Sequence, residues 1–122
     1  MKLLDSMYHI KEWRTDGTTT AADITFCPEH IIYQAHFPGQ PVTPGVCILQ
    51  IISELLEVHL DADLKLNVVK SMKFVKPISP VDDSQVTVTF QQVADSNGMV
   101  TVKGDITSGD VLYTRFTLHY GR

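Results

Sequence analysis

Residues 35–60 read AHFPGQPVTPGVCILQIISELLEVHL, and two parts of this stretch decide the fold. The second part, residues 46–60, contains neither glycine nor proline and is long enough for a helix of about four turns. Its polar residues recur at i, i+3, i+4 and i+7 and form one narrow stripe, namely Gln50, Ser53, Glu54 and Glu57. A helix on a protein surface carries a wider polar face, so we expect this helix to be enclosed on most sides.

Strand patterns surround the predicted helix. Residues 22–26 alternate between apolar and polar, and further strands are predicted over residues 67–75, 85–94, 99–106 and 111–120. Asn97-Gly98 predicts a hairpin turn, and Ser108-Gly109-Asp110 predicts another. One long helix among five or six mostly consecutive strands indicates a single α+β domain over residues 1–122. A curved antiparallel sheet or a partner subunit must then cover the helix.

Composition narrows the functional class. The formal net charge is -4 and no long basic run is present, which argues against nucleic-acid binding. No segment has the pattern of a signal peptide or a membrane span, and two cysteines make no disulfide framework. We therefore expect a soluble, cytoplasmic protein in a reducing compartment. The histidines show no metal-ligand spacing, so neither a metal nor a cofactor is expected.

The first part of the stretch, residues 35–46, holds the candidate chemistry. Three prolines and two glycines restrain its backbone, and it leads into the start of the helix. Unpaired N–H groups and the helix dipole favour an oxygen that gains negative charge there, and Gly45 lets a ligand approach closely. His36 can act as a base near neutral pH, which suits proton abstraction next to a thioester carbonyl. On spacing alone, a stiff connection in which His36 only bonds a neighbour remains an equal alternative.

The same segment carries a family resemblance. Residues 36–46 resemble the signature of the FabA/FabZ 3-hydroxyacyl-(acyl carrier protein) dehydratases, and residues 72–82 are similar to the strand and turn after that family's central helix. The resemblance implies a hotdog fold, in which a curved antiparallel sheet wraps one long helix. It also implies a homodimer, or an oligomer of dimers, with continuous sheets and an acyl tunnel at the interface. The implied reaction is dehydration of a 3-hydroxyacyl thioester on acyl carrier protein to the trans-2-enoyl form.

The resemblance also implies roles for individual residues. His36 matches the catalytic histidine, and Gly45 matches the glycine whose N–H holds the thioester carbonyl. The remaining residues of the motif are expected to bind the substrate, namely Phe37, Pro38, Gly39 and Val46. Gln50 with Cys47 after Pro44-Gly45-Val46 is similar to dehydratase-like proteins that accompany aryl-polyene or pigment-type lipid synthesis.

One position departs from the family. Gln50 stands where the dehydratases carry an acid that protonates the departing hydroxyl across the dimer interface, and a carboxamide cannot give up a proton. Glu54, one turn further on the same stripe, is a candidate acid acting through a water, or else a solvated or salt-bridged residue near the dimer seam. A third possibility is that His36 transfers both protons while Gln50 holds the hydroxyl or a water.

Two functional alternatives accompany the dehydratase prediction. Gln50 could position water in a hotdog thioesterase, or the chain could be a non-catalytic acyl-binding subunit that pairs with an active dehydratase. The densest basic group has two interpretations, docking of an acidic acyl carrier protein or protection of a sheet edge. Its members are Lys65, Lys70, Lys73 and Lys76.

Overall fold

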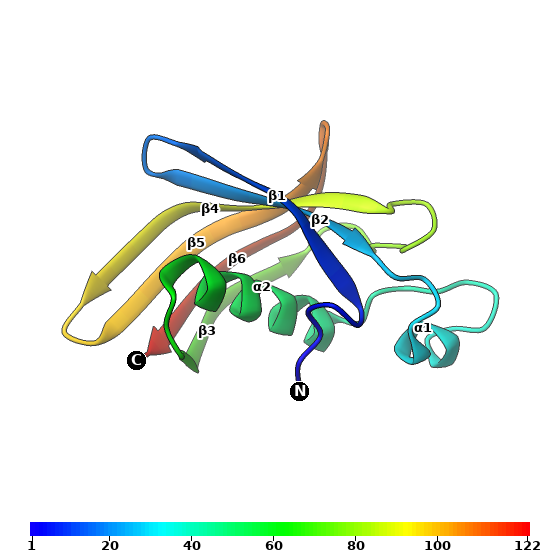
Figure 1. Ribbon diagram of the computed structural model, residues 1–122, viewed down its shortest axis with the longest axis horizontal. Helices are drawn as coiled ribbons and strands as arrows, with labels where there is room; N and C mark the ends of the chain where they lie inside the picture. The colour runs from blue at the N-terminus through cyan, green and yellow to red at the C-terminus, as the bar shows by residue number, and fades with distance from the viewer.

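Six antiparallel strands form one sheet in the order β1-β2-β4-β5-β6-β3 in the computed structural model, which describes residues 1–122. The elements are β1 (Tyr8–Asp16), β2 (Thr19–Phe26), α1 (Ile31–Ala35), α2 (Gly45–Leu60), β3 (Lys65–Phe74), β4 (Gln85–Ser96), β5 (Met99–Ser108) and β6 (Val111–Gly121). The curved sheet lies against α2 on one face (Figure 1). This arrangement confirms the predicted hotdog fold.

The hairpin between β4 and β5 forms where the sequence predicts it. Asn97 and Gly98 both have positive φ, 53° and 76°, as a two-residue turn with the twist of the strands requires. The turn between β5 and β6 likewise contains Gly109 at a φ of 57°. These two turns place three consecutive strands side by side in the sheet.

The core lies between α2 and the concave face of the sheet. Ile51, Ile52, Leu55 and Leu56 are buried on the helix and pack in one cluster with strand residues such as Val88. The enclosure predicted for the helix is incomplete in the single chain, because Val46 and Val58 remain exposed. From the polar stripe, Glu54 is only 6% exposed, so one predicted polar position belongs to the interior.

Two elements differ from the sequence prediction. The first strand, β1, was not predicted, because a bulge between Ile10 and Glu12 interrupts the alternation of Tyr8 and Ile10 before Trp13. The short helix α1, which begins at Ile31, was not predicted either. The side chain of His30 caps that helix by accepting a hydrogen bond from the Ile32 N–H at 3.1 Å.

The two edges of the sheet differ in chemistry. The edge strand β1 is rich in charged residues, whereas the other edge strand, β3, exposes Val68 and Val69 at 49% and 45%. Lys65, Lys70 and Lys73 also lie on β3 and are exposed. None of the helices in the structure combines the length and the apolar character that a membrane span requires.

Candidate active site

A hydrogen-bonded loop carries His36 to the start of α2. His36 ends α1, where its N–H donates to the Ile32 carbonyl at 3.0 Å, and its own carbonyl accepts from the Val42 N–H at 2.8 Å. The peptide groups of Phe37 and Gln40 exchange two further bonds, of 3.2 and 2.9 Å. Since Val42 lies only three residues before Gly45, the backbone of His36 is held near the tip of the helix.

Buried contacts anchor the end of this loop to the core. Thr43 is buried, its N–H donates to the Ile78 carbonyl at 2.8 Å, and its hydroxyl shares a 2.8 Å hydrogen bond with the buried Tyr33 hydroxyl. Burial raises the pKa of Tyr33 to about 12, so this phenol remains protonated at neutral pH. The chain therefore reaches α2 from a fixed direction.

The tip of α2 offers unpaired donors. The N-cap residue is Pro44, which supplies no side-chain cap, and the chain provides no acceptor for the N–H groups of Gly45 and Val46. A Cβ atom at Gly45 would lie 3.0 Å from the ring of Phe74, so glycine leaves a narrow space between this ring and the helix. The N–H groups of Gly45 and Val46 are therefore free to donate to an oxygen that approaches the tip.

The imidazole of His36 lies at the surface of the single chain. His36 is exposed, and its ring stands edge-on to that of Phe37 at 5.5 Å between centroids. Phe37 is itself 58% exposed, and Pro38 and Gly39 continue the exposed surface. The ring is thus not locked into core packing, and an apolar surface adjoins it.

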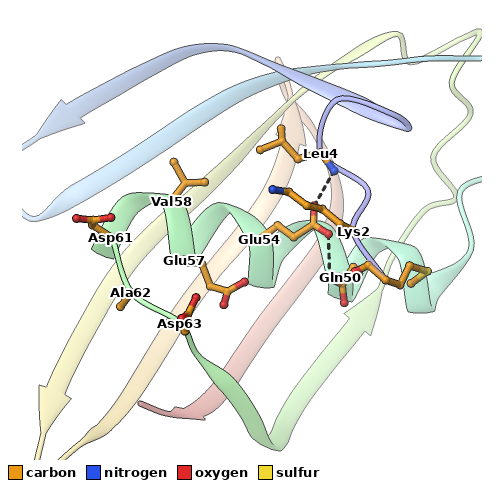
Figure 2. A pocket seen from close by; sticks show the side chains of 10 residues that line it. Lys2, Leu4, Gln50, Glu54, Glu57, Val58, Asp61, Ala62 and Asp63 are labelled. Carbon is orange, nitrogen blue, oxygen red and sulfur yellow. Dashed lines mark hydrogen bonds between the residues drawn. The ribbon is translucent and has the colours of Figure 1, made fainter.

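Gln50 and Glu54 form a direct pair on α2. The Gln50 Nε2 group donates to Glu54 Oε2 at 2.8 Å and to the carbonyl of Met1 at 2.7 Å. Glu54 also accepts from the N–H groups of Leu3 and Leu4, each at 2.8 Å. Figure 2 shows the N-terminal segment lying across the two side chains.

Tyr8 completes the surroundings of Glu54. Its buried hydroxyl donates to Glu54 Oε1 at 2.9 Å. Burial, followed by the charge and hydrogen bond of Glu54, raises the pKa of Tyr8 well above its usual value. Sequence reasoning missed Tyr8, Leu3 and Leu4 as partners of this helix, because contacts across some fifty residues leave no local pattern.

Gln50 and Glu54 line an open hollow of ≈ 520 Å³, here called the N-terminal groove. Its walls are Met1, Lys2, Leu4, Gln50, Glu54, Glu57, Val58, Asp61, Ala62 and Asp63 (Figure 2). Neither His36 nor Gly45 belongs to it. In one chain the predicted residues thus form two groups, His36 with the tip of α2, and Gln50 with Glu54.

The cysteines stand apart from this chemistry. Cys47 is buried at 2% exposure and belongs to the core. Burial raises the pKa of the Cys47 thiol, so it is not poised as a nucleophile. Cys27 and Cys47 are both free thiols.

Comparison with known proteins assigns the family. The model of the ApeI-like family, described as ApeI dehydratase, matches residues 12–110. The chain belongs to the ApeI-like dehydratase family.

Sequence relatives of this ApeI-like chain carry the name of the predicted activity. The 3-hydroxyacyl-[acyl-carrier-protein] dehydratase FabZ of Koribacter versatilis is 33% identical over 124 residues, covering 95% of this chain and 76% of that protein. The FabZ of Latilactobacillus sakei is 33% identical over 85 residues, 61% of either chain. The match to the FabZ of Lactobacillus helveticus, 30% identical, spans 55% of its length. Membership of the FabA/FabZ-type dehydratases, predicted from residues 36–46, is confirmed.

Solved structures support the fold of the ApeI-like chain. The dehydratase heterocomplex ApeI:P from Xenorhabdus doucetiae contains a chain that matches with a TM-score of 0.67 at 16% identity, covering 93% of this chain and 96% of the other. The (R)-hydratase from A. caviae involved in PHA biosynthesis matches with a TM-score of 0.53 at 20% identity, covering 79% and 76%. At these identities the likeness supports the shared hotdog architecture.

Proposed function

We propose that this ApeI-like chain dehydrates a 3-hydroxyacyl thioester to the trans-2-enoyl thioester. The observation that carries the proposal is a histidine held by a bonded loop beside a helix tip whose first N–H groups have no acceptor. Such donors stabilise an enolate oxygen, and the histidine supplies the base that forms the enolate. The dehydratase names of the family and of its relatives agree with this chemistry.

The reaction divides into proton abstraction and loss of the hydroxyl. The His36 imidazole takes the proton from C2, and the electron pair of that C–H bond passes into the enolate, whose oxygen accepts from the Gly45 N–H. The pair then forms the C2–C3 double bond as the C3–O bond breaks. Because Gln50 cannot donate a proton to the departing oxygen, the proton held by His36 is transferred to it, and water leaves.

A dimer would bring the two groups of site residues together. The β3 edge exposes Val68 and Val69, and the neighbouring Phe74 and Val75 are also more than half exposed. An apolar, unpaired strand edge favours pairing with a second copy, whereas charges protect the β1 edge. In the proposed homodimer, the sheets join through β3, and Gln50 of the partner subunit faces His36.

Replacement of His36 tests the proposed base. We expect His36→Ala to lower the dehydration rate of 3-hydroxybutyryl thioesters by about 10²–10⁴-fold. The readout is the absorbance of the enoyl thioester, measured in both directions of the reaction. Since His36 is exposed, the variant should keep the melting temperature of the wild type. Unchanged dehydration in the folded variant would remove His36 from the mechanism.

Gln50→Glu tests the missing acid. Position 50 lies 2.8 Å from the Glu54 carboxylate, whose negative charge would raise the pKa of the introduced carboxyl group and keep a proton on it. We expect dehydration to rise by roughly tenfold or more. Gln50→Met, which introduces no acid, serves as the control. A gain no larger than that of the control would show that position 50 has no access to the departing hydroxyl.

Two alternatives are separated by product analysis. A thioesterase would release a free thiol from crotonyl thioesters, whereas a dehydratase would leave the thioester intact.

The similar chain of Xenorhabdus doucetiae comes from a dehydratase heterocomplex, which favours a test for a second dehydratase-like subunit. If the isolated chain is silent and a paralogue restores dehydration, the active form is a heterodimer.

The carrier and the compartment complete the proposal. Lys65, Lys70 and Lys73 stand exposed along β3 and suit an acidic acyl carrier protein. The free thiols of Cys27 and Cys47 suit the reducing cytoplasm. Dehydration of carrier-bound and coenzyme A-bound substrates, compared at low and high salt, would identify the carrier.

A further inference from the structure

The neighbours of Gln50 determine which way its carboxamide faces. Its two inward partners, Glu54 Oε2 and the Met1 carbonyl, are both acceptors, so only the NH₂ group of the amide can face them. The orientation therefore follows from the hydrogen-bond chemistry of the partners. The Gln50 Oε1 atom accepts no hydrogen bond within the chain and is turned away from the pair.

Glu54 is engaged on all sides. Its Oε1 atom accepts from the Leu4 N–H and the Tyr8 hydroxyl, and its Oε2 atom accepts from the Leu3 N–H and from Gln50. A carboxylate has about four lone-pair sites, and four donors occupy them here. Glu54 contributes to the wall of the N-terminal groove but is only 6% exposed, and its four hydrogen bonds leave no free lone pair for a substrate. The hydrogen bonds of Glu54 therefore hold neighbouring groups of the chain in place and do not bind a ligand.

We propose that Glu54 is a positioning residue that makes Gln50 a pure hydrogen-bond acceptor toward the substrate, and this rests on the dehydratase function proposed above. The 3-hydroxyl group of the substrate then keeps its proton and donates a hydrogen bond to Gln50 Oε1. Both lone pairs of the hydroxyl oxygen stay free, so the oxygen can receive the proton that His36 carries. If the NH₂ group faced outward, it would occupy one of those lone pairs.

An acceptor at this position also confers specificity. It binds a 3-hydroxyacyl group, which has a proton to donate, and it opposes a 3-oxoacyl group, whose oxygen only accepts. The site thereby distinguishes a substrate from the 3-oxo compound that differs from it by two hydrogens. One hydrogen bond gained against one acceptor–acceptor contact corresponds to about tenfold or more in affinity.

The test compares two stable ligands. Pantetheine amides that carry a 3-hydroxybutyryl or a 3-oxobutyryl group keep the carbonyl but resist elimination, and calorimetry gives the Kd of each. The wild type should prefer the hydroxy amide by about tenfold or more. Gln50→Met should abolish the preference. Glu54→Gln should reduce it, because a carboxamide at position 54 no longer obliges Gln50 to turn its NH₂ group inward, and only the Met1 carbonyl still does so.

Two further variants provide a control and a second test. Glu57→Gln changes a carboxylate one turn along the same helix that accepts only from the Leu64 N–H, at 2.9 Å, and should leave the preference at the wild-type value. The exchange Gln50→Glu with Glu54→Gln again presents an acceptor outward and should retain the preference for the hydroxy amide. This exchange also tests the proposal if Glu54→Gln alone does not fold, as judged by circular dichroism.

The outcomes separate this inference from the function on which it rests. If both amides bind and Gln50→Met abolishes the preference while folded Glu54→Gln keeps it, Glu54 does not set the orientation. If Gln50→Met keeps the preference, Gln50 does not contact the 3-position, and the inference fails while acyl binding stands. If neither amide binds, the proposed acyl-thioester function fails with it.

Discussion

Asp23 shows how a single residue stabilises the sheet away from the site. Its side chain is nearly buried on β2, where it accepts from the Thr87 hydroxyl at 2.6 Å and pairs with the Arg14 guanidinium. Burial alone would raise the pKa of Asp23, but the bonds from Thr87 and Arg14 and the nearby positive charges hold it below its usual value. The carboxylate thus links three neighbouring strands in its charged form.

Asp23→Asn should lower the free energy of unfolding by about 1–3 kcal/mol near neutral pH, as expected for hydrogen bonds to a charged group. A depressed pKa in the folded state means that this stabilisation is full above the unfolded pKa of 3.8 and is lost as the pH falls through the lower, folded value. Urea unfolding at about pH 7 and about pH 3 should therefore show a large difference from the wild type that shrinks in acid.

Asp16→Asn supplies the control for that measurement, because Asp16 ends β1, the partner strand in the same hairpin, and is exposed. Its unfolding free energy should stay within about 0.5 kcal/mol of the wild type at either pH. An Asp23→Asn difference that is constant with pH would contradict the assigned role of the charge.

At the scale of elements, α2 combines two functions in different parts of its length. Its middle packs into the core through Ile51, Ile52 and Leu55, whereas its first turn leaves N–H groups without partners. The missing cap lowers the stability of the helix by about 1 kcal/mol, and packing of the middle offsets it. The ring of Phe74 narrows the space at this tip and brings β3 into the site.

Gly45→Ala should separate folding from activity. An alanine is a better helix former than glycine, so the free energy of unfolding should change by less than about 1 kcal/mol. Its Cβ atom would stand 3.0 Å from the Phe74 ring and fill the approach to the N–H group. Displacement of a reacting group by about 1 Å can lower the reaction rate by about 10²-fold, so we expect kcat/KM to fall by about the same factor. Activity equal to the wild type, with folding retained, would place the thioester elsewhere.

Phe74→Leu combined with Gly45→Ala identifies the cause of the loss. Recovery of activity in the double variant would show that the Cβ atom acts by pushing the Phe74 ring. Persistent loss would show that it excludes the substrate itself.

At the scale of the whole molecule, a single chain keeps the predicted site residues in two separate groups. His36 lies outside the N-terminal groove that Gln50 lines, and the β3 edge remains open. Apolar residues are exposed at that edge and at the starts of the helices, including Ile31 and Val46. Such exposed apolar surface favours association with a partner. A symmetric pair joined at β3 would cover this surface and repeat the site twice.

Val69→Lys should dissociate the proposed dimer. Val69 is 45% exposed on β3, and a lysine there would place a charge at the centre of the expected interface. Light scattering after size exclusion should show the mass of two chains for the wild type and of one for the variant, and dehydration should fall with it. Thr15→Lys, on the charged β1 edge, should stay dimeric. A wild type that runs as one chain would contradict the assembly.

The sequence by itself determined the long helix, most of the strands, the turns at Asn97-Gly98 and Gly109, and the family, because each rests on a local pattern or a dense motif. It also singled out His36, Gly45 and Gln50. Only the tertiary structure decided that β1 is a strand, that residues 31–35 form a helix, and that Glu54 is an interior residue with four donors. The reason is physical: a bulge, a cap or a hydrogen bond across fifty residues depends on what the folded chain brings near, which neighbours in sequence do not encode.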